Sequence, residues 1–159
     1  MAYIPEIMIV YHLGRTQHAN ELNGEGSRIH GGRWNPVGIP CIYTSENRAL
    51  AVLEYSANVA LDKIPRSLSI TTFQIPDASW KDCKVSELPG NWNQHPVPME
   101  TMQWGGALLK ANHYLVLRIP SIILLQEYNY IINPLHTDMY FIKIIEVTDF
   151  VYDVRIKKQ

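Results

Sequence analysis

The segment from Gly24 to Ser45, GEGSRIHGGRWNPVGIPCIYTS, combines two arginines with closely spaced glycines. Arg28 and Arg33 can each offer forked N–H donors to phosphate oxygens. Glycines such as Gly31 and Gly32 let the main chain approach a ligand closely or adopt a positive φ. The segment therefore predicts a site for a small ligand that carries a diphosphate. The alternative is a glycine-rich surface turn whose arginines are solvated.

Two familiar phosphate-binding motifs do not match this segment. A Walker A loop requires a GK[ST] ending, which the segment lacks. The stretch GEGSRI lacks the third glycine of a dinucleotide-binding fingerprint and follows no clear strand. A site here would therefore use a different arrangement of main chain and arginine.

A carboxylate is predicted on the apolar face of the helix that follows. Ser45 is placed as an N-cap, Glu46 lies in the first turn, and the helix is expected over 46–61. Glu54 shares a face with apolar residues at helical spacing, which are Leu50, Leu53, Ala57 and Leu61. Such a glutamate forms a buried ion pair, reaches water at the edge of the stripe, or works in a cleft.

The remaining elements give the fold class. Apolar and alternating patterns predict strands over 7–13, 40–44, 67–75, 114–119 and 140–147, a helix over 99–111, and a loop over 77–98. Strands outnumber helices, and the helices are too unevenly placed for regular βαβ alternation. We expect a single α+β domain over 1–159 with a mixed, mostly antiparallel sheet.

Composition limits the partners. The formal net charge of -1 gives no broad basic surface for nucleic acid or an anionic membrane. Cys41 and Cys83 belong to no CxxC or Cys/His cluster, so neither a disulfide framework nor a metal site is expected. The sequence has no run of about 18 apolar residues and no secretory leader pattern, which favours a cytoplasmic location.

Three stretches of the chain carry a family resemblance. The stretch GEGSRIHGGRWNPVGIPCIYTSENRALAVLE closely resembles the signature of RES-domain proteins, the toxins of bacterial RES/Xre toxin–antitoxin pairs. The stretches IPSIILLQEYNYIINPLH and FVYDVRI extend the similarity, which covers the chain from about Tyr11 onward.

The resemblance implies a fold similar to ADP-ribosyltransferases of the diphtheria-toxin type. It also implies a growth-arresting activity that consumes NAD as a substrate, with no cofactor, and releases nicotinamide by hydrolysis or phosphorolysis. ADP-ribosylation of a protein target is the alternative. The implied partner is an Xre-like antitoxin whose C-terminal part covers the pocket, in a toxin–antitoxin oligomer.

The family pattern matches Arg33, Tyr43, Glu54 and Ser121 by direct alignment of motifs. The usual tyrosine–arginine pair of the first strand is here Tyr11 and His12. We expect Glu54 to stabilise the ribosyl cation and His12 to hold ribose hydroxyls.

The other implied roles concern the two ends of NAD. Tyr43 is expected to stack on or hydrogen-bond the nicotinamide end, and Ser121 to position the ribose or the acceptor. Arg33 and Arg28 are expected to neutralise the diphosphate, with Gly31 and Gly32 beside it.

Two other classes of function use the same residue types. A metal-free ribonuclease could use His12 and His30 as acid and base, with Arg33 and Glu54 beside them. The near-neutral charge and the lack of a basic stretch before the final RIKK argue against an RNA substrate. A nucleotide-binding domain without turnover is the third possibility.

Overall fold

The computed structural model describes residues 6–76 and 80–157. Within these residues one sheet has the strand order β4-β5-β6-β2-β1-β3-β7. Its strands are β1 (Ile7–Arg15), β2 (Ile42–Ser45), β3 (Leu68–Pro76), β4 (Trp80–Asp82), β5 (Val116–Pro120), β6 (Tyr128–Ile132) and β7 (Lys143–Phe150). The edge pair β4–β5 is parallel, and the other neighbouring pairs are antiparallel. The expected α+β class with a mixed, mostly antiparallel sheet is confirmed.

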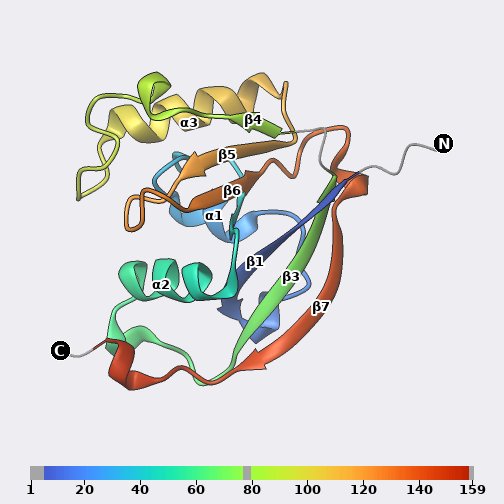
Figure 1. Ribbon diagram of the computed structural model, residues 1–159, viewed down its shortest axis with the longest axis vertical. Helices are drawn as coiled ribbons and strands as arrows, with labels where there is room; N and C mark the ends of the chain where they lie inside the picture. Colours follow the sequence, from blue (N-terminus) through green and yellow to red (C-terminus); the bar gives the residue numbers. More distant parts are fainter. Residues whose placement is uncertain (1–5, 77–79, 158–159) are drawn as a thin grey trace.

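The helices of the described residues are α1 (Glu25–His30), α2 (Arg48–Asn58) and α3 (Met99–Ala111). Short 3-10 turns lie at Thr16–His18, Leu61–Lys63, Val85–Glu87, Met139–Phe141 and Val154–Ile156. In Figure 1, α3 lies beside β4 and β5, whereas α2 lies near the place where β6 and β1 diverge. The bounds predicted for the helix at 99–111 are confirmed.

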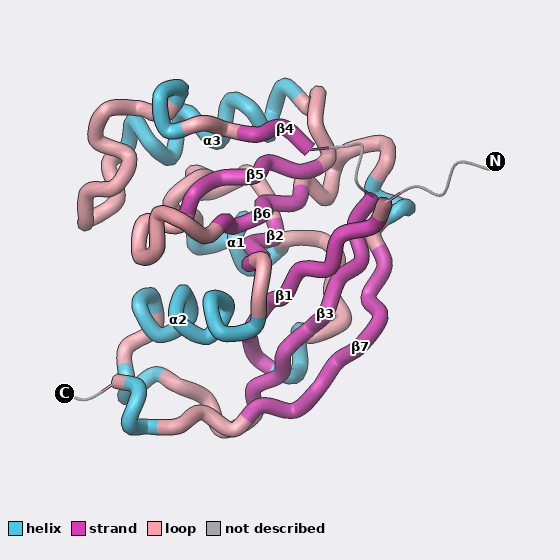
Figure 2. Tube along the Cα trace, in the orientation of Figure 1, coloured by secondary structure: helices cyan, strands magenta, loops and turns pink. Residues whose placement is uncertain are grey.

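The sheet changes direction between β1 and β2. β1 and β3 pair along nine registered positions, from Ile7–Pro76 to Arg15–Leu68. β1 and β2, by contrast, share a single registered pair in the described chain, Tyr11 with Ser45. Figure 2 shows β1, β3 and β7 running together away from β5 and β6. Because β1 and β2 pair at so few positions, backbone N–H and C=O groups along their facing edges are available for contacts with side chains.

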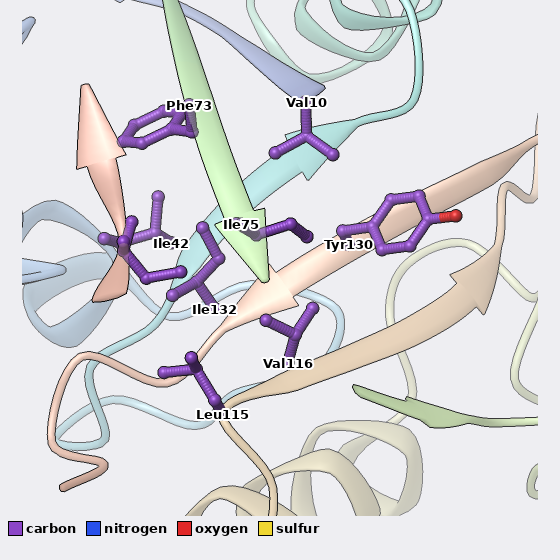
Figure 3. Packing of buried hydrophobic residues seen from close by; sticks show 9 residues of the cluster. Val10, Ile42, Phe73, Ile75, Leu115, Val116, Tyr130 and Ile132 are labelled. Carbon is purple, nitrogen blue, oxygen red and sulfur yellow. The ribbon is translucent and has the colours of Figure 1, made fainter. Parts of the chain in front are cut away.

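One cluster of buried side chains ties the two parts of the sheet together. Val10 of β1 and Phe73 and Ile75 of β3 pack with residues of the other part, including Ile132 and Val116 (Figure 3). These side chains are almost completely removed from water. Burying apolar surface at this junction holds the two parts of the sheet together despite their short ladder.

The helix expected over 46–61 is shorter than predicted. Asn47, and not Ser45, caps it, because the Asn47 side chain accepts a hydrogen bond from the Leu50 N–H at 2.7 Å. Ser45 lies instead in β2. The helix ends at Asn58 because Val59 adopts extended backbone angles. Of the predicted stripe, Leu50 is buried and Leu53 half-buried, whereas Ala57 is exposed and Leu61 lies beyond the helix.

Several other predictions need correction. The strand at 7–13 is longer at its C-terminal end, and those at 40–44, 67–75, 114–119 and 140–147 begin and end later than predicted. The expected loop at 77–98 contains β4 and a 3-10 turn, although 77–79 lie outside the described residues. The short helix α1 and the strand β6 were not predicted. β6 matters most, because it contributes a residue to the candidate site.

Candidate functional site

Two hollows meet along the junction between β2, α2 and β6. The smaller, about 200 Å³, includes His12 in its wall and is called the His12 hollow here. The larger, about 510 Å³, includes Arg33 and is called the Arg33 hollow. The residues common to both walls are Tyr43, Glu54, Asn58 and Asn129. Because the hollows share these side chains, they form one elongated cleft, and the Arg33 hollow alone has the size of a small-molecule site.

Glu54 lies where the two hollows meet, and one of its oxygens is fully engaged. Ser121 Oγ donates to Glu54 Oε1 at 2.7 Å, and Asn129 Nδ2 donates to the same oxygen at 2.7 Å. None of the described residues donates to the other oxygen, Oε2. Of the three surroundings expected for Glu54, the structure shows the wall of a cleft, and its carboxylate has one oxygen without a donor among the described residues.

Ser121 supports Glu54 from behind the cleft. Its side chain is fully buried and belongs to neither wall. The Ser121 oxygen accepts hydrogen bonds from the Ile123 and Leu124 N–H groups at 3.1 and 3.2 Å. Its own hydrogen is therefore directed to Glu54. This geometry does not fit the expectation that Ser121 contacts ribose or an acceptor, because its hydroxyl is used inside the protein.

His12 closes the gap in the ladder between β1 and β2. Its Nδ1 lies 2.8 Å from the Tyr43 carbonyl oxygen, and because a carbonyl can only accept, Nδ1 carries the hydrogen. Burial lowers the pKa of His12, although the hydrogen bond to Tyr43 acts in the opposite direction. A neutral ring with Nδ1–H leaves Nε2 as an acceptor. His12 is therefore suited to receive a hydroxyl hydrogen and unsuited to act as a permanent cation.

Tyr43 uses its hydroxyl to hold the glycine–arginine segment. The hydroxyl donates to Asn35 Oδ1 at 2.5 Å and accepts from the Trp34 N–H at 3.0 Å. Burial raises the pKa of Tyr43, so the hydroxyl stays protonated. Gly32 is required here, because a Cβ at this position would lie 2.6 Å from the Tyr43 oxygen. Tyr43 therefore offers a ligand its ring, since its hydroxyl is already engaged.

Arg33 is the cation of the larger hollow. Its Nη1 donates to the carbonyl oxygens of Trp92 and Gln94, both at 2.8 Å. Partial burial lowers the pKa of Arg33, while the nearby Glu54 acts to raise it. An arginine stays charged even so. Among the described residues Arg33 forms no ion pair, so its Nε and Nη2 hydrogens are available to an anion.

Arg28, the second predicted phosphate ligand, does not reach the cleft. It lies on α1, where it forms an exposed ion pair with Glu25, three residues earlier. This pairing raises the pKa of Arg28 and lowers that of Glu25. Arg28 is absent from both walls, whereas Gly31 and Gly32 line the Arg33 hollow as expected. The structure thus brings together His12, Tyr43, Glu54, Arg33 and the two glycines, and it leaves Arg28 outside.

Three residues of the site were not found from the sequence. Asn129 of β6 binds Glu54, Asn35 accepts from Tyr43, and His95 lines the Arg33 hollow. A polar amide among the aromatic and aliphatic residues of YNYII was the available signal for Asn129, because an unsatisfied amide in a buried strand is unfavourable. Asn35 and His95 lie in irregular segments that offer no such pattern.

The cysteines lie apart from this chemistry. Cys41 and Cys83 are free and buried, and burial raises the pKa of each thiol to about 12. In the described parts of the chain, no group of three or more His, Cys, Asp or Glu side chains is arranged to hold a metal ion. A search of the same residues for a helix long and apolar enough to cross a membrane finds none.

Comparison with known families and proteins gives a consistent assignment. The model of the RES domain family matches residues 9–153. The "Prs ADP-ribosylating toxin" of Sphingobium sp. (strain YBL2) is 32% identical over 145 residues, covering 89% of this chain and 90% of that protein. A "Toxin Res" of Photorhabdus laumondii is also 32% identical, over 154 residues that cover 95% and 98% of the two chains.

A solved structure shares the fold. A chain in the crystal structure of the M. tuberculosis MbcT-MbcA toxin-antitoxin complex superposes with a TM-score of 0.73. The superposition covers 93% of this chain and 86% of that one, at 18% sequence identity. At this level of identity the likeness establishes a common fold.

Proposed function

The chain belongs to the RES domain family, and from this premise we propose that it is the toxin of a bacterial toxin–antitoxin pair and that it cleaves NAD. The names of its relatives, an ADP-ribosylating toxin and a Toxin Res, support this assignment over most of the chain. In this reaction the bond between nicotinamide and ribose breaks, and its electron pair leaves with the nicotinamide nitrogen. Water or phosphate then attacks the ribose carbon.

The position of Glu54 is the single observation on which this function rests. Its carboxylate belongs to the walls of both hollows, and Oε2 is unoccupied by any described donor. Cleavage of a glycosidic bond builds positive charge on the ribose carbon and ring oxygen. A fixed carboxylate at that point stabilises the charge as it develops. An elongated dinucleotide would place its reacting ribose at the meeting point of the hollows.

The surrounding groups suit the rest of the substrate. Arg33 has N–H groups left for the diphosphate, and His12 presents an acceptor to a ribose hydroxyl. The ring of Tyr43, which lines both hollows, offers an apolar surface to the nicotinamide end. Tyr43 would thus act through stacking, since its hydroxyl is engaged with Asn35 and Trp34.

Incubation of the purified protein with NAD tests the proposal. Chromatography and mass spectrometry should show nicotinamide together with ADP-ribose in water, or ADP-ribose 1-phosphate when phosphate is the acceptor. ADP-ribose attached to a protein would identify the alternative, transfer to a protein target, which the name of the Sphingobium relative favours. Binding of NAD without release of nicotinamide would leave a nucleotide-binding domain, and shortening of RNA in a parallel reaction would favour a ribonuclease.

A protein antitoxin is the proposed partner. The relatives named as toxins support a neutralising protein, and we expect an Xre-like antitoxin to cover the cleft in the cytoplasm. Expression of the chain alone should arrest bacterial growth, and co-expression with the product of an adjacent gene should restore it. Purification of the two proteins together, followed by the NAD assay, would show whether the antitoxin blocks turnover. Growth that continues without any antitoxin would contradict the toxin assignment.

A further inference from the structure

A hydrogen-bonded relay links three elements around Glu54. Ser45 of β2 donates its hydroxyl hydrogen to Asn129 Oδ1 at 2.8 Å. Asn129 of β6 in turn donates from Nδ2 to Glu54 Oε1 of α2 at 2.7 Å. Ser45 is also the residue that pairs with Tyr11 at the junction of β1 and β2. The relay therefore fixes the carboxylate with respect to the point where the two parts of the sheet meet.

The orientation of the Asn129 amide follows from its neighbours. One end faces a carboxylate oxygen, which can only accept, so the NH₂ group must point toward Glu54. The opposite orientation would place two oxygens against each other. The Ser45 hydroxyl then completes the arrangement, because it donates to the amide oxygen. Ser45 is buried in the wall of the His12 hollow, which limits the access of water to this contact.

We infer that Asn129 is a positioning residue of the active site, which together with Ser121 binds Oε1 of Glu54 and leaves Oε2 facing the substrate. This inference rests on the proposed NAD-cleaving function. The two donors come from different parts of the chain, Asn129 from β6 and Ser121 from the turn after β5. Donors from two directions restrict rotation of the carboxylate about its last bond, whereas a single donor would permit it.

The consequence is an effect on turnover and not on substrate affinity. Asn129 borders both hollows, but its amide oxygen accepts from Ser45 and one of its two Nδ2 hydrogens is donated to Glu54. A group that only orients the carboxylate contributes when charge develops on the ribose, so its loss lowers kcat and leaves KM almost unchanged. A group that binds NAD directly would raise KM.

Two substitutions of Asn129 distinguish the effect of its Nδ2 hydrogen-bond donor from the effect of its side-chain volume. Asn129→Ala removes the donor, and we expect kcat to fall about 10- to 100-fold, as for the loss of a hydrogen bond to a charged group, with KM changed by less than about threefold. Asn129→Asp keeps the shape but places an oxygen against the carboxylate. We therefore expect Asn129→Asp to be at least as impaired as Asn129→Ala. If Asn129 merely filled space, the isosteric Asn129→Asp variant would be the more active of the two.

Controls keep the test independent of folding and charge. Asn20→Asp introduces the same charge at an exposed position and should retain wild-type kcat. Ser45→Ala, at a residue that also lines the His12 hollow, removes the contact that fixes the amide but leaves the Asn129 donor in place, so its kcat should fall by a smaller factor than that of Asn129→Ala. Thermal unfolding of each variant checks that it is folded, and Ser45→Ala still tests the relay if the Asn129 variants fail to fold.

A crystal structure distinguishes failure of this inference from failure of the proposed function. In Asn129→Asp the Glu54 side chain should turn away from its position in the wild type, whatever reaction the protein catalyses. A wild-type protein that releases no nicotinamide would refute the proposed function alone. An unmoved Glu54 in Asn129→Asp, or a wild-type kcat in Asn129→Ala, would overturn the role of Asn129.

Discussion

The two sides of the cleft are built differently. On the acidic side, Glu54 projects from the middle of a helix and is held by Ser121 and Asn129, each of which is itself fixed by further hydrogen bonds. On the basic side, Arg33 lies in an irregular segment and is tied to a second irregular segment through two carbonyl oxygens. One side is fixed by regular elements, and the other depends on contacts between loops.

This difference suits the two tasks that the proposed cleavage of NAD requires. Stabilising a short-lived cation requires a carboxylate within a few tenths of an ångström of its place, which helices and strands provide. Holding a diphosphate tolerates more adjustment, because several phosphate oxygens can meet several N–H donors. The acidic side should therefore control turnover, and the basic side should control binding.

The largest effect is expected on the acidic side. Glu54→Gln should lower kcat by roughly a hundredfold or more, the loss of about 2.7 to 4 kcal/mol typical of a positioned electrostatic group. The fold should be preserved, because the substituted amide oxygen can still accept from Ser121 and Asn129. Nicotinamide release under saturating NAD measures the effect, with exposed Glu146→Gln as the matched control. Wild-type turnover in Glu54→Gln would remove this carboxylate from the mechanism.

On the basic side, the two arginines should behave in opposite ways. Arg33→Ala should raise KM for NAD about 10- to 100-fold, since charged hydrogen bonds contribute about 1.5 to 3 kcal/mol, with a smaller change in kcat. Arg28→Ala should leave both constants close to wild type, because Arg28 pairs with Glu25 outside the cleft. Steady-state kinetics of the pair measures the contrast. An equal rise in KM for NAD in both variants would show that the ligand reaches α1.

The contrast also explains which parts of the site the sequence predicted. Glu54 follows from helical periodicity, since a carboxylate on an apolar face needs a partner or a cleft. From residue type and spacing alone, Arg33 and Arg28 were alike as neighbours in one glycine-rich segment, and only the family resemblance singled out Arg33. The helix α1 separates them, because it places Arg28 beside Glu25 at i, i+3. That helix has only six residues and is preceded by Gly24 as its N-cap, so no periodicity revealed it.

The fold was predictable to a similar extent. Strands such as β1 and β3 and the helix α3 have enough apolar residues in register to be located, with errors at their ends. β6 was missed, and with it Asn129, because its contact with Glu54 joins residues 75 positions apart. Such contacts follow from the order of strands in the sheet, which local patterns do not encode. The role of Ser121 behind Glu54 was hidden for the same reason.

A smaller effect is expected from loss of the Tyr43 hydroxyl of β2, which binds the segment that carries Arg33. Tyr43→Phe removes the hydroxyl that binds Asn35 and the Trp34 N–H, leaving two groups of buried residues without this hydrogen bond. The free energy of unfolding should fall by about 1 to 3 kcal/mol, with KM raised more than kcat is lowered. Urea denaturation measures the free energy of unfolding, and steady-state kinetics with NAD measure KM and kcat. Tyr140→Phe, on an exposed ring, should change neither the free energy of unfolding nor the kinetic constants. Equal free energies of unfolding for the two variants would contradict this role for the Tyr43 hydroxyl.

The smallest effect concerns His12, which joins β1 to β2 where the two sides of the cleft meet. Burial holds its pKa below the ordinary value of 6.5, so the unfolded chain binds a proton more readily than the folded chain. The contribution of His12 to the free energy of unfolding is therefore fully present above about pH 6.5 and decreases as the pH drops toward the lower pKa of the folded state. The decrease is at most about 1.4 kcal/mol per pH unit. Denaturation between pH 7 and pH 5 should show a shallower loss in His12→Gln than in wild type. His113→Gln, at an exposed position, should keep the wild-type dependence of the free energy of unfolding on pH. The same dependence in His12→Gln as in wild type would mean that the His12 ring is protonated as easily in the folded protein as in the unfolded one.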